Sequence, residues 1–129
     1  MTTQFQKEEA YYAPKLRSLS PQATGAVIRL RNAAYNEGVL PRKVKIMAAL
    51  AISASIRCEP CLEYYAKEAV EAGATMQELV EMLNVAIAMQ GCPGEVWADK
   101  ALKAFEKYAG NDHHGAKPGV GEKEDSCCT

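Results

Sequence analysis

The spacing of apolar residues, at intervals of three and four, constrains the fold more than any other feature of this sequence. A half-buried strand alternates between apolar and polar residues with period two. No segment of useful length in this sequence shows that alternation. The helical pattern covers six segments, approximately 3–19, 21–37, 41–56, 58–73, 75–90 and 95–109. We therefore predict an all-α fold of about six helices.

Residues typical of helix ends separate these segments. Ser20 precedes a proline and predicts a capped helix start, while Gly38 and Gly73 predict helix ends because glycine tolerates the left-handed conformation found there. The sequence Thr-Met-Gln-Glu at 75–78 is a capping box, and Gly-Cys-Pro-Gly at 91–94 predicts a turn. These signals imply that short connections join the expected helices.

The length and composition indicate one folded unit. A chain of 129 residues that is 48% hydrophobic and 24% charged can bury one core and is short for two. From residue 110 onward glycine, proline and charged residues replace apolar ones, and the segment ends in Cys127 and Cys128. We predict a single helical domain over 1–109 and a flexible tail over 110–129.

The charge distribution bears on partners and location. The formal net charge is -1 and both signs are interspersed, so we expect neither nucleic acid nor an anionic membrane as a partner. The first ten residues, MTTQFQKEEA, lack the basic and apolar regions of a secretory signal, and the longest apolar run, Ile46–Ile56, is about half of a membrane span. A cytoplasmic location is the expectation.

The most informative motif is Cys58-Glu59-Pro60-Cys61. An odd count of five cysteines without an export signal favours reactive thiols over a disulfide scaffold. At a helix start, unpaired backbone N–H groups and the positive end of the helix dipole favour thiolate. The spacing of three residues puts both side chains on one helical face, within reach of a disulfide.

Three interpretations of this pair remain open at this point: a redox dithiol, half of a metal site, or two small core residues. A structural zinc site needs a second pair of ligands, and the sequence offers for it Cys92, His113, His114, Cys127 and Cys128, four of them in the expected tail. We therefore expect no structural metal and no cofactor. Capture of a soft metal or metalloid by the tail thiolates stays an alternative.

A longer pattern surrounds the motif. The apolar segment RKVKIMAALAISASI leads into CEPC, and YAKEAVEAGAT, MQELVEMLNVA and the small-residue turn GCPG follow. Over residues 41–105 this pattern resembles the carboxymuconolactone decarboxylase family, and specifically its alkylhydroperoxidase D-like branch. The resemblance implies an all-helical fold that assembles as trimers or hexamers, with the dithiol in a cleft between helices.

The resemblance also implies roles for individual residues. Cys61 would attack, Cys58 would resolve, and a glutamate and a histidine would relay protons, at positions that hold Ile46 and Tyr65 in this chain. Isoleucine carries no proton, and tyrosine is a poor base at neutral pH that can still donate a hydrogen bond. Loss of acid–base help typically lowers rates by about 10² to 10⁴. Tyr65 shares a helical face with Cys61 and is our third site candidate.

Together these observations predict a thiol–disulfide oxidoreductase or weak peroxidase, with a thioredoxin-like or dihydrolipoyl-type reductant. The alternatives are a redox sensor without turnover, a thiophilic metal-binding protein, and, less favoured, a lactone decarboxylase. The helix at 41–56 is apolar on nearly all sides after its first turns, which predicts burial all round. Because such a short chain supplies little cover, we expect a homo-oligomer.

Overall fold

The computed structural model describes residues 14–110, and this range contains six helices and no strand. In chain order they are α2 (Pro14–Leu19), α3 (Pro21–Tyr35), α4 (Arg42–Ser55), α5 (Glu59–Glu71), α6 (Met76–Gln90) and α7 (Cys92–Ala109). The predicted all-α fold of about six helices is confirmed. The expected tail beyond Gly110, with its histidines and paired cysteines, lies outside the described residues.

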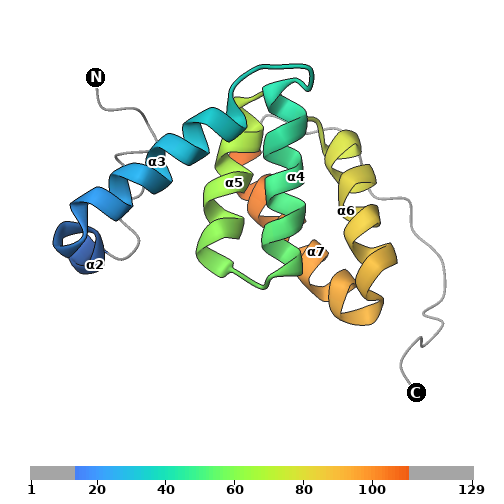
Figure 1. Ribbon diagram of the computed structural model, residues 1–129. Coiled ribbons are helices and arrows are strands. Elements are labelled where there is room, and N and C mark those ends of the chain that lie inside the picture. The colour runs from blue at the N-terminus through green and yellow to red at the C-terminus, as the bar shows by residue number, and fades with distance from the viewer. Residues whose placement is uncertain (1–13, 111–129) are drawn as a thin grey trace, which may run out of the picture.

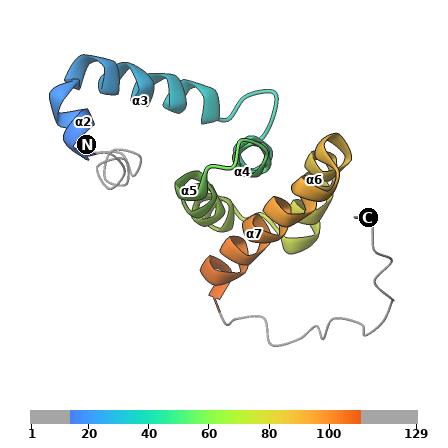
Figure 2. The ribbon, with the colours of Figure 1, turned by 90° about the horizontal axis from the view of Figure 1, so that it is seen from below.

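Helices α4 to α7 pack side by side, whereas α2 and α3 extend away from them (Figure 1). Along the chain α4 and α6 run one way and α5 and α7 the other. Figure 2, seen along the helices from below, places α7 across the side of the group away from α3. Helix α7 packs against α4, α5 and α6, so it joins the other three into one core.

The core consists of aliphatic residues and many alanines, which let the helices approach closely. Its larger members are Ile46, Met47, Leu50, Leu62, Leu79, Leu83 and Phe105. Burial of α4 on all sides, expected for a central or an intersubunit helix, is not reached within one copy of the chain, because Ile52 leaves 59% of its surface exposed. The apolar residues of α4 therefore divide between the core and an outward stripe.

The helix ends follow the sequence signals in part. Gly73 has φ +83°, and the capping box is present: Glu78 N–H donates to Thr75 Oγ1 at 3.2 Å and Thr75 N–H donates to Glu78 Oε1 at 3.0 Å. Helix α3 ends at Tyr35, before Gly38, and the Ser20 hydroxyl makes no capping bond. The predicted turn at 91–94 is confined to Gly91, and α7 already begins at Cys92.

Candidate redox site

The link between α4 and α5 is short and tightly bonded. Arg57 adopts the left-handed conformation with φ +56°, and its N–H donates to the Ala54 carbonyl at 3.2 Å. The N–H of Cys58 donates to the Ser53 carbonyl at 3.1 Å. These bonds attach the link to the end of α4, and Cys58 becomes the residue that caps α5.

The first turn of α5 holds the motif. The helix begins at Glu59, with Cys58 as its capping residue, and the Leu62 N–H donates to the Cys58 carbonyl at 3.0 Å. Pro60 fits here because its missing N–H would have no helical acceptor. Cys61 completes the turn, where backbone N–H groups lack partners and the helix dipole favours negative charge. The sequence predicted this placement to within one residue.

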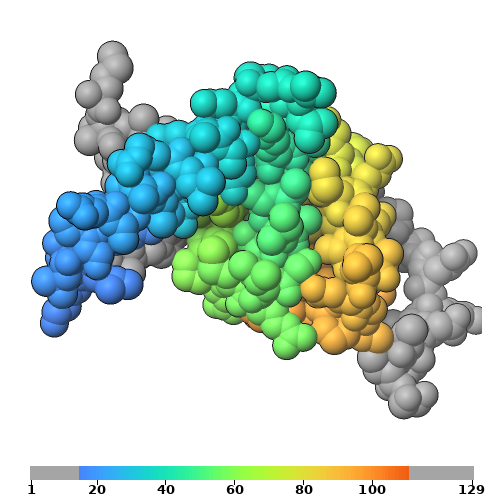
Figure 3. Space-filling view, viewed as in Figure 1, coloured from blue at the N-terminus to red at the C-terminus, as the bar shows by residue number. Residues whose placement is uncertain are grey.

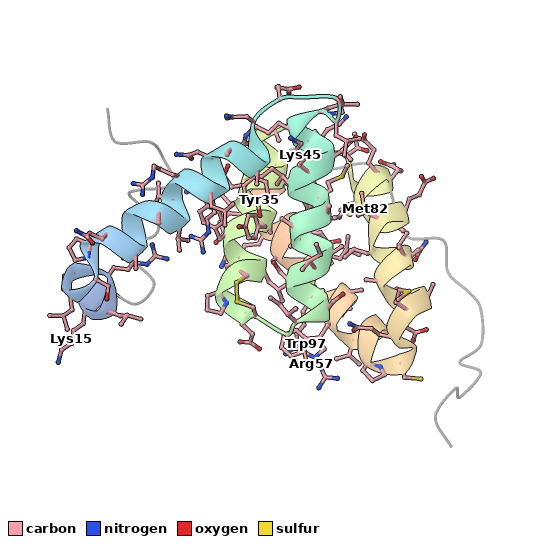
Figure 4. All side chains as sticks on the ribbon, viewed as in Figure 1. Lys15, Tyr35, Lys45, Arg57, Met82 and Trp97 are labelled. Carbon is pink, nitrogen blue, oxygen red and sulfur yellow. A yellow bond between two sulfur atoms is a disulfide. The ribbon has the colours of Figure 1, made fainter. Side chains whose placement is uncertain are left out.

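Cys58 and Cys61 are joined by a disulfide, with their Cα atoms 5.2 Å apart (Figure 4). Both residues are half-buried, so neither is enclosed by the core. Of the three interpretations, that of two inert residues inside the core fits this placement least. The disulfide lies at the start of α5 (Figure 4).

Tyr65 lies one turn further along α5 and meets two other tyrosines. The hydroxyl groups of Tyr35 and Tyr65 are hydrogen-bonded at 3.0 Å, and the two rings meet edge to face at 5.6 Å. The Tyr64 ring also meets Tyr65 edge to face, at 4.9 Å. Burial, and then the hydrogen bond with Tyr35, raise the pKa of Tyr65 well above its usual value. Tyr65 is therefore a hydroxyl that keeps its proton.

A buried ion pair follows on the same helix. Glu68, seven residues after Cys61, has a side chain only 5% exposed, and Arg42 Nη2 binds its Oε2 at 2.8 Å. Its other oxygen, Oε1, has no hydrogen-bond partner among the described residues. Ile46, at the position where the family resemblance implies a glutamate, is fully buried in the core. The buried carboxylate on this side of α5 is therefore supplied by α5 itself, through Glu68, and not by α4 at Ile46.

Sequence reasoning missed Tyr35, Arg42 and Glu68 as neighbours of the site. Glutamate is rarely buried, so the pattern of α5 gave no reason to place Glu68 inside. Tyr35 precedes Tyr65 by thirty residues, and nothing local indicates that α3 reaches α5. One feature of the sequence could have indicated the ion pair, because Arg42 and Glu68 carry opposite charges on neighbouring helices.

A groove of about 570 Å³ runs between α5 and α7. Its lining consists of Glu59, Pro60, Leu62, Glu63, Lys100, Lys103, Ala104 and Lys107. Lys100 pairs with Glu59 at 3.0 Å and Lys107 with Glu63 at 3.1 Å. The hydrogen bond from Tyr108, and then Lys107, lower the pKa of Glu63. The two residues between the cysteines therefore form one end of a groove with paired charges.

Three further features concern metal ligation, the remaining described cysteine and membrane spans. No group of three or more His, Cys, Asp or Glu side chains in residues 14–110 is arranged to hold a metal ion. Cys92, the first residue of α7, is half-buried. No helix between residues 14 and 110 has the length and apolar character needed to cross a membrane.

Fold and site together define a small all-helical protein with a Cys-x-x-Cys disulfide at the start of a core helix. Residues 21–104 match the carboxymuconolactone decarboxylase family, and the chain belongs to this family. The resemblance that the sequence motifs carried is thereby confirmed at the level of the family.

The relatives agree with this assignment. The chain is 31% identical to a carboxymuconolactone decarboxylase family protein from Legionella pneumophila whose apo crystal structure is solved. The TM-score is 0.74, over 80% of this chain and 92% of that one. An uncharacterised protein of Cupriavidus necator is 34% identical over 70% of this chain and 80% of its own length. An uncharacterised protein of the cox locus of Paracoccus denitrificans is 28% identical over 66% of this chain and 77% of its own length.

Proposed function

We propose that this protein is a thiol–disulfide oxidoreductase in which Cys61 attacks and Cys58 resolves. The observation that carries the proposal is a disulfide between two half-buried cysteines at the N-terminus of α5. A thiolate there gains from the helix dipole, and its partner lies close enough to close the ring again. Family membership is compatible with this role.

The reaction balances without a cofactor. The Cys61 thiolate attacks one sulfur of a substrate disulfide, forms a mixed disulfide and releases the other sulfur as a thiolate. The Cys58 thiolate then attacks the Cys61 sulfur, which forms the Cys58–Cys61 disulfide and releases the second substrate thiolate. Both released thiolates take up the protons that the two cysteines gave to water. A dithiol reductant, thioredoxin-like or dihydrolipoyl-type, returns the protein to its reduced form.

Peroxide is a poorer substrate in this proposal. Its reduction needs a proton for the departing oxygen, and the position of the family glutamate holds Ile46 inside the apolar core. Tyr65 can donate a hydrogen bond but is a weak base because its pKa is raised. We expect peroxide turnover about 10² to 10⁴ slower than in a protein with a full acid–base pair.

A turnover assay tests the proposal. Reduction of a small disulfide is coupled to a thioredoxin system or to dihydrolipoamide, and Cys61→Ser, Cys58→Ser and the matched control Cys92→Ser are compared with wild type. Cys61→Ser should lose turnover, Cys58→Ser should stop with one substrate thiol bound at Cys61, and Cys92→Ser should cycle normally. Full turnover by Cys61→Ser would refute the assignment. Oxidation once per chain without cycling would indicate a redox sensor.

Self-association is the second part of the proposal. Ile52 on α4 and Ile56 just after its end are exposed and stand one turn apart, as do Val85 and Met89 on α6. Helices α4 and α6 are neighbours and run in the same direction (Figure 1). Both pairs of exposed residues therefore lie toward the same end of the molecule. We name these four residues the α4–α6 patch and propose that a second copy covers it.

A further inference from the structure

Helices α4 and α5 end in the same backbone motif. At the end of α4, the N–H groups of Arg57 and Cys58 donate to the carbonyls three and five residues back, at 3.2 and 3.1 Å. At the end of α5, the N–H groups of Gly73 and Ala74 do the same, each at 3.0 Å. This pair of bonds is the Schellman motif, which places one residue in the left-handed conformation. That residue is Arg57, with φ +56°, in α4 and Gly73, with φ +83°, in α5.

Arginine is an unusual residue at such a helix end. The position is commonly glycine, because the Cβ of other residues makes the left-handed backbone unfavourable. Gly73 meets this requirement, whereas Arg57 is the non-glycine residue with positive φ between residues 14 and 110. The arginine therefore brings no advantage to the backbone, and what it adds to this position is its side chain.

The Arg57 side chain is open to solvent. It is exposed, and its guanidinium has no hydrogen bond or ion pair within the described residues, whereas the Arg42 guanidinium binds Glu68. Figure 4 places Arg57 at the lower edge of the molecule, where Figure 3 shows green residues of the link between α4 and α5 projecting. The carboxylate of the nearby Glu59 is bound by Lys100 at 3.0 Å. The Arg57 guanidinium is thus available to a ligand from solution.

Arg57 is also close to the sulfur atoms, because it directly precedes Cys58. Consecutive Cα atoms are about 3.8 Å apart, and the Cα atoms of Cys58 and Cys61 are 5.2 Å apart. The Cα of Arg57 therefore lies within about 9 Å of the Cα of Cys61. The long, flexible arginine side chain covers this range, so it can meet a charged group on a substrate held at Cys61.

We propose that Arg57 is a specificity-determining residue of the dithiol site and that it selects disulfides whose halves carry a carboxylate, such as peptide disulfides. The guanidinium presents a planar fork of N–H donors that matches a carboxylate. The inference rests on the proposed function, in which the Cys61 thiolate bonds to one substrate sulfur and the other sulfur leaves as a thiolate. Arg57 forms an ion pair with the substrate and takes no part in the exchange of bonds.

The test compares three small disulfides of different charge: dithiodipropionate with two carboxylates, hydroxyethyl disulfide with no charge, and cystamine with two ammonium groups. Reduced full-length protein is mixed with each and quenched in acid at successive times, and the linked Cys58–Cys61 peptide is quantified by mass spectrometry. Arg57→Gln should slow the reaction with dithiodipropionate about three- to fivefold, which corresponds to the loss of one exposed ion pair. The rate with hydroxyethyl disulfide should not change, and the rate with cystamine should rise slightly.

Two further variants make the result specific. A change in the reactivity of the Cys61 thiolate would alter the rates with all three disulfides by the same factor, so the readout is the ratio of the dithiodipropionate rate to the hydroxyethyl disulfide rate. Lys15→Gln removes the same charge from α2, far from the disulfide in Figure 4, and should leave this ratio unchanged. Arg57→Gly should lower the ratio as Arg57→Gln does and should unfold at a higher temperature than wild type, because glycine suits the left-handed position.

An equal ratio in wild type and Arg57→Gln would overturn the inference and leave the proposed function standing. A ratio that falls as much in Lys15→Gln would assign the selectivity to net charge and would overturn it as well. Unfolding of Arg57→Gly at a lower temperature than wild type would show that the arginine supports the fold, which contradicts the inference. Absence of the linked peptide with all three disulfides would refute the proposed function itself, and the inference with it.

Discussion

At the scale of single residues, Glu68 is the side chain whose burial is most costly. A carboxylate that is 95% enclosed would cost several kcal/mol if it were unpaired, and the Arg42 guanidinium offsets this cost at 2.8 Å. Arg42 is the first residue of α4 and is itself about one-third exposed, so water lies near the pair. The charge next to Tyr65 is thus held by an arginine from the neighbouring helix.

We predict that Arg42→Met lowers the free energy of unfolding by about 3 kcal/mol, because it leaves the Glu68 charge buried without a partner. Lys43→Met is the matched control. Lys43 pairs with Glu78 at 2.8 Å at the surface, and its loss should cost less than about 1 kcal/mol. Urea unfolding of both variants at neutral pH measures the difference. Equal, small losses would mean that Arg42 does not offset the Glu68 charge.

The contact between α5 and α7 gives a prediction about pH. The Tyr108 hydrogen bond lowers the pKa of Glu63, so the folded state favours its ionised form. Ionised Glu63 therefore stabilises the folded protein at pH values above about 4.3, the pKa of glutamate in the unfolded chain. This contribution is lost as the pH falls through the lower pKa that Glu63 has in the folded protein. Because Glu63 is partly exposed, Glu63→Gln should destabilise by less than about 1 kcal/mol at pH 7.

The measurement is urea unfolding of Glu63→Gln and wild type at pH 7 and again below pH 4. The difference between the two proteins should shrink in acid. Glu81→Gln, an exposed position on α6, should show little difference at either pH. A Glu63 effect of the same size at both pH values would contradict the assigned cause.

At the scale of helices, the close approach of α6 and α7 depends on one small residue. Gly94 is buried in the first turn of α7, and an added Cβ would lie 3.2 Å from both the Ala86 carbonyl oxygen and Ile87 Cα. Those two atoms belong to the backbone of α6, so they cannot move as a flexible side chain would. The start of α7 therefore requires glycine for packing and not for its φ angle.

We predict that Gly94→Ala destabilises the protein by about 1 to 3 kcal/mol through overpacking. Gly25→Ala is the control, since Gly25 is also helical but its Cβ would meet only the mobile end of Arg29 at 3.3 Å. Alanine favours helix over glycine, so Gly25→Ala should be neutral or stabilise by up to about 1 kcal/mol. Thermal unfolding of both variants compares the signs. Destabilisation of the same size in both would assign the effect to helix propensity.

The elements themselves were largely predictable from the sequence, and the contacts between them were not. Capping chemistry is local, so Thr75, Gly73 and the start of α5 at the cysteines could be placed from neighbouring residues. The end of α3 could not, because Tyr35, its last residue, bonds to Tyr65 on another element. The same holds for Gly94, which looked like a turn residue and instead packs against α6.

For the candidate site, the sequence placed Cys58, Cys61 and Tyr65 on one helix but said nothing of what surrounds them. Periodicity reports which face of a helix is apolar, and it carries no information about which helix covers that face. The partners Tyr35 and Arg42 come from α3 and α4, so they required the fold. The roles of the three predicted site residues stay predictions.

At the scale of the whole molecule, a large share of apolar surface faces outward. Met89 is 83% exposed, and the remaining three residues of the α4–α6 patch are each more than half exposed. Leu16, Leu19 and Leu30 on α2 and α3 are exposed as well. Large exposed apolar patches usually mark interfaces, and this distribution supports self-association of the chain.

We predict that Met89→Glu shifts the protein toward smaller species at micromolar concentration, because a charge in the α4–α6 patch would be buried without a partner in the assembly. Gln77→Glu adds the same charge at an exposed polar position of α6 and should not alter the association state. Sedimentation velocity measures both variants beside wild type. A stable wild-type monomer would contradict the assembly, and an unaltered Met89→Glu assembly would place the interface elsewhere.

Repeated oxidation and reduction of the Cys58–Cys61 pair is the most direct test of the account. Native full-length protein is reduced, exposed to a small disulfide or to peroxide, and reduced again, and after each step its cysteines are alkylated and mapped by mass spectrometry. We predict that the linked Cys58–Cys61 peptide forms and disappears in every cycle, and that reduced Cys61 alkylates readily in the native state. Thiols that resist alkylation in the native protein, or a pair that stays linked under dithiol reductant, would contradict it.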